Sequence, residues 1–342
     1  MIRSILQERA VRAHERGRRL VAPMMGFPGV DLIGGSIKLA QQNFGVHFRA
    51  VKALADRFAP DLVFPLMDLS VEANALGRYT VFPKDDSATV VRDAFRFEDL
   101  DALKAVNVAF DGRVLGYIET VKMMSVGLPG DMLKGAYLIG PYTLAALLLG
   151  ADDAAVASIE DPRRLHALCD FAAETIQEYG RLLISAGADV IAVLEPSAVM
   201  LGPRQFGEFS ASYVKDIVAG FKYSDVAVLY HTCGNTMHLI DRMAASGAVG
   251  LSLDAPETGV DLVRVARTLP PDILVMGNIS PTAVMLRAAP AGVERAVAAL
   301  LADMRDVPNF ILSTGCDLPQ ETPPANIEAF MRAGRAEPRP AR

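Results

Sequence analysis

Residues 184–196 read ISAGADVIAVLEP and join the end of a helical pattern to a short apolar run. Gly187 stands where the helical spacing stops, and glycine readily adopts the left-handed conformation that caps a helix. Residues 188–194 then read as a buried strand, and the same order recurs in AASGAVG at 244–250, where Gly247 is the expected cap. A helix, a glycine and a short apolar strand in succession are typical of a parallel α/β sheet.

Eight apolar runs of this kind occur along the chain, with helical patterns between them. They are 20–25, 61–67, 135–140, 188–194, 225–230, 249–254, 272–277 and 309–314. An alternating β/α order with eight strands favours a sheet closed into a barrel over an open doubly wound sheet. We therefore predict an α/β fold consisting of a single (β/α)8 TIM barrel.

The segments outside this repeat have their own predictions. The first 20 residues look like an amphipathic helical arm and lack the apolar core of a signal peptide. Residues 68–134 are too long for one connection, so we predict an insertion between the second and third strands, with a hairpin and helices over the barrel mouth. Residues 1–332 form one domain in this interpretation, and the Pro/Ala/Arg-rich residues 333–342 form a disordered tail.

The composition excludes several classes of protein. Of 342 residues, 51% are hydrophobic and 22% are charged, and the formal net charge is −6 without any Lys/Arg run, which argues against nucleic acid as a partner. No apolar stretch reaches the length of a membrane span. Three cysteines are too few for a disulfide scaffold in a chain of this size. We expect a cytoplasmic protein in which Cys169, within a helical pattern, is a packing residue.

Polar side chains follow the predicted strands at the ends where a TIM barrel carries its functional groups. They are Asp68, Glu72, Glu195, His231, Cys233, Asp254, Asn278 and Cys316. We expect Asp68 and Asp254 to act in catalysis, and Glu72, Glu195 and Asn278 to bind substrate. For Asp68 and Glu72 the alternative is capping of the helix that begins near Ser70.

The cysteines at strand ends point to a metal. Cys233, in the motif His231-x-Cys233, and Cys316 are 83 positions apart in the sequence. They follow predicted strands five and eight, which end on the same rim of the barrel. One imidazole and two thiolates suit tetrahedral zinc, and three protein ligands with an open fourth position are typical of a catalytic site. Asp254 is either an oxygen ligand for that fourth position or a loop cap, and both alternatives stay open.

Four segments resemble a known family. HTCGNT at 231–236, STGCDLPQETPPANIEAF at 313–330, GPYTLA at 140–145 and MDLSVEANALG at 67–77 are similar to the uroporphyrinogen decarboxylase superfamily. More narrowly, they resemble its methylcobalamin:coenzyme M methyltransferase branch, over about residues 5–332. The resemblance implies zinc bound by His231, Cys233 and Cys316. It also implies methyl transfer from methylcob(III)alamin, carried by a separate corrinoid protein, to a zinc-activated small thiol such as coenzyme M.

Two other functions compete with this one. A metal-free decarboxylase of the parent superfamily needs an arginine-bearing motif, but no arginine lies between Arg19 and Arg49, and its reaction leaves the cysteines unexplained. A non-catalytic relative would only bind the corrinoid protein. The chain has no Asp-x-His-x-x-Gly motif for cobalamin, which agrees with an external donor. Arg204 is a candidate anchor for a sulfonate, and the acceptor stays open between coenzyme M, homocysteine and other thiols.

Overall fold

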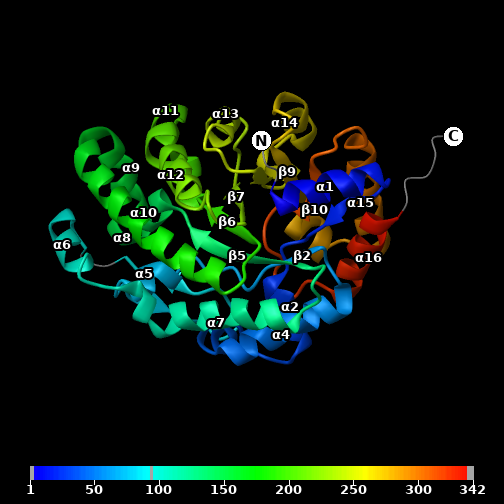
Figure 1. Cartoon of the computed structure of the whole chain (residues 1–342), viewed down its shortest axis with the longest axis horizontal. Coiled ribbons are helices and arrows are strands. Elements are labelled where there is room, and N and C mark those ends of the chain that lie inside the picture. The colour runs from blue at the N-terminus through cyan, green and yellow to red at the C-terminus, as the bar shows by residue number, and fades with distance from the viewer. Residues whose placement is uncertain (1–3, 93–94, 337–342) are drawn as a thin grey trace.

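The computed structural model describes residues 4–92 and 95–336. All eight predicted strands are present in one parallel sheet, ordered β1-β10-β9-β8-β7-β6-β5-β2 (Figure 1). Their bounds are β1 Leu20–Val21, β2 Leu62–Val63, β5 Leu133–Ile139, β6 Val190–Leu194, β7 Ala227–Thr232, β8 Gly250–Leu253, β9 Leu274–Ile279 and β10 Phe310–Thr314. The predicted TIM barrel is thus confirmed.

The two end strands, β1 and β2, close the barrel through Asp61. The backbone N–H of Asp61 donates to the carbonyl of Val21 at 3.0 Å, and its carboxylate accepts the N–H of Val21 at 2.8 Å. One aspartate therefore satisfies the backbone at the seam where regular pairing is absent.

Each strand is followed by a helix of the outer ring. These helices are α4 Phe44–Phe58, α7 Gly112–Gly127, α10 Pro162–Ser185, α12 Ser212–Gly220, α13 Ile240–Ala244, α14 Leu262–Thr268, α15 Pro290–Asp303 and α16 Pro324–Arg335. Shorter helices lie in the loops after the strands: α2 Gly26–Leu32, α3 Ile37–Gln42, α5 Val71–Ala75, α6 Leu100–Leu103, α8 Pro141–Leu149, α9 Ala151–Glu160 and α11 Pro203–Phe206. Gly187 and Gly247 both have positive φ at the helix ends predicted for them.

The insertion between β2 and β5 is present but shorter than predicted. It contains α5, the antiparallel hairpin of β3 Thr80–Val81 and β4 Thr89–Val90, and α6. The predicted end of the insertion at residue 134 is wrong, because α7 packs on α4, α10 and β5 and therefore belongs to the outer ring of helices. Gly116 and Thr120 interrupt its apolar pattern, which hides a face on which Val114, Tyr117, Val121 and Met124 are buried.

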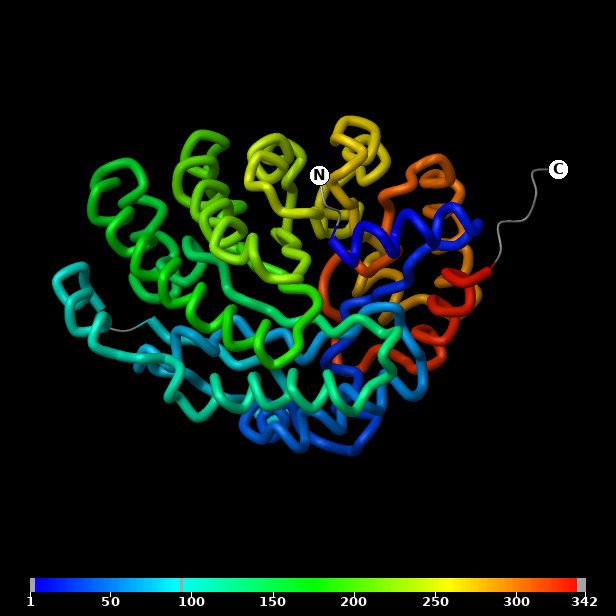
Figure 2. The backbone as a smooth tube through the Cα atoms, viewed as in Figure 1, coloured from blue at the N-terminus to red at the C-terminus, as the bar shows by residue number. Residues whose placement is uncertain are grey.

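The N-terminal arm is helix α1, Ile5–Glu15, which begins in a capping box between Ser4 and Gln7. Its Leu6, Ala10 and Ala13 pack with the residues that fill the barrel interior. Gln7 donates to the carbonyl of Asp272, just before β9, so α1 covers the N-terminal end of the strands. Figure 2 shows α1 and α16 on the same side of the molecule.

The predicted tail begins too early. Helix α16 continues to Arg335 and so includes the first three residues of the segment assigned to the tail, while 337–342 lie outside the described residues. Gly334 lies against Val21 and Leu312, and this close packing on β1 and β10 holds the last turn of the helix.

Two apolar layers hold the barrel. The inner layer lies inside the strands and includes Leu62, Val190, Ala227 and Leu274, whereas the outer layer joins the strands to the helices and includes the fully buried Cys169.

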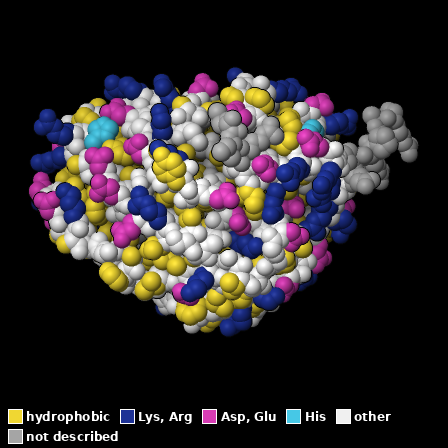
Figure 3. Space-filling model, viewed as in Figure 1, with side chains coloured by type: hydrophobic (Ala, Val, Ile, Leu, Met, Phe, Trp, Pro, Cys, Tyr) yellow, Lys and Arg dark blue, Asp and Glu magenta, His cyan; other side chains and the backbone are white. Residues whose placement is uncertain are grey.

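Among the described residues no single helix is long and apolar enough to span a membrane, although the bent pair α8 and α9 meets those criteria together. Lys, Arg, Asp and Glu side chains are interspersed over the face shown in Figure 3.

Candidate metal centre

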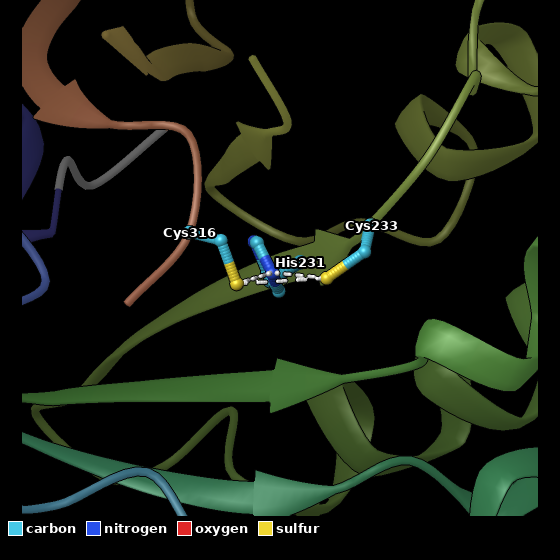
Figure 4. Close-up of side chains that lie close together, drawn as sticks. All are labelled: His231, Cys233 and Cys316. Atoms are coloured by element: carbon cyan, nitrogen blue, oxygen red, sulfur yellow. Dashed lines mark hydrogen bonds between the residues drawn. The ribbon is translucent and has the colours of Figure 1, made fainter. Parts of the chain in front are cut away.

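His231, Cys233 and Cys316 meet at the C-terminal rim of the barrel. His231 is the penultimate residue of β7, Cys233 follows that strand, and Cys316 lies two residues beyond β10. The His231 Nε2 atom lies 3.3 Å from Cys233 Sγ and 3.9 Å from Cys316 Sγ, and the two sulfurs are 3.7 Å apart (Figure 4). In the described part of the chain this is the one group of three such side chains within ligand distance.

These distances fit a metal ion. Tetrahedral zinc with bonds of about 2.3 Å to sulfur and about 2.0–2.1 Å to nitrogen separates two sulfurs by about 3.8 Å and nitrogen from sulfur by about 3.6 Å. The observed separations of 3.3, 3.7 and 3.9 Å lie around those values. His231, Cys233 and Cys316 could therefore form one face of a coordination tetrahedron, which leaves a fourth position. Without a metal, the hydrogen bond with Cys233 and burial raise the pKa of the Cys316 thiol well above its usual range.

Neighbouring side chains orient these ligands. The His231 Nδ1 atom lies 3.1 Å from the hydroxyl of Ser252 on β8, which leaves Nε2 to face the sulfurs. Gly234 follows Cys233 with a φ of +85°, so the chain turns sharply there. The N–H of Gly234 donates to Asp254 Oδ2 at 2.7 Å, and Asp254 Oδ1 accepts the N–H of Ala255 at 2.7 Å. Both oxygens of Asp254 thus bond the backbone of this loop, as a loop cap would, while its role in catalysis or as a fourth ligand stays a prediction.

Asp68 lies in a buried hydrogen-bond network. Its Oδ2 atom pairs with Arg113 of α7 and also accepts from Gln41 at 2.9 Å and from the Tyr117 hydroxyl at 3.1 Å. Its Oδ1 atom accepts the N–H and the hydroxyl of Ser70. The side chain of Asp68 is 0% exposed and that of Arg113 is 10% exposed. The network ties the start of the insertion to the barrel wall. It holds Ser70, the residue before α5, but α5 has no side-chain capping hydrogen bond, so the capping alternative is not observed there.

Glu72 and Glu195 are both buried, and burial raises the pKa of each to about 7. Glu72 Oε1 accepts the N–H of Ile139 at the end of β5. Glu195 accepts the N–H groups of Tyr142 and Thr143, at the start of α8, and the Thr143 hydroxyl. Both carboxylates satisfy backbone donors beside the barrel mouth, and substrate binding by either one stays a prediction.

Asn278, the fifth residue of β9, is 2% exposed and donates to the backbone carbonyl of Asp254 at 2.9 Å. It therefore supports the loop that in turn holds Gly234. Of the eight residues predicted from the strand ends, three form the cluster, Asp254 and Asn278 hold one of its loops, and Asp68, Glu72 and Glu195 lie in separate hydrogen-bond groups.

Three side chains near these groups had no predicted role. Asp317 follows Cys316 after the eighth predicted strand, and burial raises its pKa to about 7. Tyr137 lies in β5, and its buried hydroxyl has no hydrogen-bond partner. Arg113 is 45 positions from its partner Asp68, and no local pattern indicates that pairing.

Fold and site together define the class: a TIM-barrel protein with one imidazole and two thiols, a group that could hold a metal ion, at the C-terminal rim of its strands. Residues 33–336 match the family described as uroporphyrinogen decarboxylase (URO-D). The chain belongs to this family.

Its relatives include two kinds of enzyme. The methylcobamide:CoM methyltransferase MtbA of Methanosarcina mazei is 29% identical over 256 residues, 74% of this chain and 72% of the relative. The uroporphyrinogen decarboxylase of a Synechococcus species is 32% identical over 249 residues, 69% of this chain and 67% of the relative. Among solved structures, a methyltransferase from Methanosarcina mazei has a TM-score of 0.86 and 21% identity, covering 97% of this chain and 98% of its own.

Proposed function

We propose that this protein is a zinc-dependent methyltransferase that moves a methyl group from methylcob(III)alamin, carried by a corrinoid protein, to a small thiol such as coenzyme M. The observation that carries the proposal is the cluster of His231 Nε2 with the sulfurs of Cys233 and Cys316, at 3.3 to 3.9 Å from one another. The similarity to MtbA supports the reaction class, because the name of that relative describes a methylcobamide:CoM methyltransferase.

The ligand set suits this chemistry for an electrostatic reason. Zinc held by two thiolates and an imidazole lowers the pKa of a thiol at the fourth position, while the thiolates already present keep the sulfur of that thiol electron-rich. His231, Cys233 and Cys316 would hold the ion. Ser252 fixes the ring orientation of His231, and Asp254 together with Asn278 holds the turn after Cys233. In this proposal Ser252, Asp254 and Asn278 position the site.

The first experiment tests the metal. The purified protein should contain about one zinc per chain. His231→Ala, Cys233→Ala and Cys316→Ala should each lose most of it, with unchanged circular dichroism because the barrel has its own large core. Cys169→Ala is the matched control, since Cys169 is fully buried in α10 away from the cluster, and it should keep the zinc. Full zinc in Cys316→Ala would contradict the ligand assignment.

The second experiment tests the reaction. Zinc-loaded protein mixed with methylcobalamin and a panel of thiols should form cob(I)alamin, which is followed by its absorbance, and the Cys316→Ala variant should not. A metal-free protein that converts uroporphyrinogen would instead show the decarboxylase activity of the second group of relatives. Binding of a corrinoid protein without thiol-dependent turnover would show a non-catalytic relative.

A further inference from the structure

A groove of about 750 Å³ lies between α1, α15 and α16, which Figure 1 shows together on one side of the molecule. Arg18 and Arg19, just before β1, and Arg305, just before β10, also line it. These residues lie where strands begin, whereas His231 and Cys316 lie where strands end, so the groove is at the opposite end of the barrel from the candidate metal centre. Its volume falls within the range of about 300–1,000 Å³ that is usual for small-molecule sites.

One face of α15 forms the apolar part of the groove. Ala298, Leu301 and Ala302 are three and four positions apart, so their side chains lie on the same face of the helix. Ala333 and Ala336, at the end of α16, line the groove as well. Most of these side chains are alanine methyl groups, which leave the space along α15 open for an apolar body.

The charged residues of the groove are mainly arginines. Four of its described lining residues are arginines and one is an acid, which gives a formal charge of +3 where the whole chain carries −6. They are Arg18, Arg19, Arg305, Arg332 and Glu294. Asp306 follows Arg305 in the sequence but is exposed and does not line the groove. Because a concave site with charges mostly of one sign concentrates ligands of the opposite sign, the groove favours anions.

Two of these arginines keep their side-chain donors free. Arg19 donates to three backbone carbonyls beyond the end of α15, at 2.6–2.8 Å, and so caps that helix. Arg332 donates from Nε to Glu294 at 2.9 Å. The side chains of Arg18 and Arg305, in contrast, have no hydrogen bond or ion pair in the part of the chain that the structure describes. Their guanidinium groups can therefore bind the anionic group of a ligand.

We propose that this groove binds a small organic anion with an apolar body, such as a medium-chain carboxylate. Arg18 and Arg305 hold the anionic group, because guanidinium and carboxylate form charge-assisted hydrogen bonds. The apolar body lies along Ala298, Leu301 and Ala302. This site goes beyond the proposed function and does not depend on it, since it lies at the other end of the barrel.

Three ligands with the same apolar chain test the charge directly: octanoate, 1-octanol and octylamine, each kept below the concentration at which it forms micelles. Calorimetric titration of the full chain should show octanoate binding at least about tenfold tighter than octanol, as expected for a charge-assisted hydrogen bond, and octylamine binding more weakly than octanol. Inorganic phosphate tests the anionic group alone. It should bind at least about tenfold more weakly than octanoate, because it lacks the apolar chain.

Two variants connect this order to the groove. The double variant Arg18→Ala/Arg305→Ala should lower the affinity for octanoate to that for octanol, and Ala302→Trp should weaken both ligands because the indole fills the groove. Arg295→Ala is the matched control, since Arg295 is an exposed arginine of the same helix that does not line the groove, and it should leave all affinities unchanged. Circular dichroism and zinc content should stay unchanged in all three variants.

Equal binding of octanoate and octylamine, or a preference for octanoate that survives the double variant, would overturn the proposal. Two further outcomes would assign the groove to another occupant. Binding to phosphatidylglycerol vesicles without binding of free octanoate would indicate a membrane surface. Tighter octanoate binding after removal of residues 337–342 would indicate that this segment competes for the groove. The presence or absence of methyl transfer tests only the proposed function.

Discussion

The imidazole of His231 lies 3.1 Å through its Nδ1 atom from the hydroxyl of Ser252, its register partner on the neighbouring strand β8. This contact fixes the ring so that Nε2 faces Cys233 and Cys316. A hydrogen bond from a ligand histidine to a neighbouring group commonly sets both its orientation and its basicity. Ser252 is therefore part of the proposed metal site although it would not touch the metal.

Ser252→Ala should keep the fold and lower zinc affinity by about tenfold or more, because the His231 ring loses its orienting partner. Competition with a chromophoric chelator measures the change. Ser246→Ala is the control, since Ser246 is equally buried but bonds the carbonyl of Met243 away from the site. Equal zinc affinities for the two variants would show that ring orientation does not depend on Ser252.

Arg113→Ala should destabilise the protein by about 3–5 kcal/mol, because it leaves the buried Asp68 carboxylate without its charge partner. Urea unfolding measures the loss. Arg92→Ala is the matched control, because the exposed pair of Arg92 with Asp153 should contribute at most about 1 kcal/mol.

Asp68→Asn separates the structural role of Asp68 from the catalytic one predicted for it. In the Arg113→Ala background it should recover part of the lost stability, because the uncompensated charge is removed. A catalytic role requires that Asp68→Asn alone also slows methyl transfer. Unchanged transfer kinetics would leave Asp68 with only its role in the network with Ser70 and Arg113.

Glu72→Gln should stabilise the protein at pH 8 and have little effect near pH 4.5. Burial raises the pKa of Glu72 from 4.5 to about 7, so its contribution to stability is fully present below pH 4.5 and is lost as pH rises through 7. Glutamine keeps the contact with the Ile139 N–H and cannot ionise. Urea unfolding at the two pH values should show a gain on the order of 2–3 kcal/mol at pH 8, and the exposed Glu174→Gln should show none.

His47→Gln should make the protein less sensitive to acid. Burial lowers the pKa of His47 from 6.5 to about 3, so the unfolded chain binds a proton that the folded protein excludes, and stability falls as pH drops from 6.5 toward 3. The His47 Nε2 atom accepts the N–H of Leu66, and a glutamine oxygen can take that role. Midpoints of thermal unfolding at pH 7 and pH 4.5 should lie closer together in the variant; an unchanged interval would show that His47 is not responsible.

The barrel and the three proposed zinc ligands could be predicted from the sequence for a simple reason. Apolar runs that alternate with helical patterns are local features, and parallel strands bring their C-terminal ends to one rim whatever their separation along the chain. To predict that His231, Cys233 and Cys316 lie together, it was enough that each lies at the end of a predicted strand. The insertion boundary failed where the local pattern was weak, at the glycine and threonine positions of α7.

The remaining contacts of the site depend on side-chain direction and on packing between distant segments. The turn after Cys233 decides which oxygen of Asp254 accepts the N–H of Gly234. The same turn decides whether the Asp254 side chain faces the cluster. Arg113 meets Asp68 because α7 packs beside α5, and Asn278 reaches the backbone of Asp254 because β9 lies next to β8. Periodicity along the chain carries no information on these contacts, because each one joins elements whose mutual orientation exists only in the folded barrel.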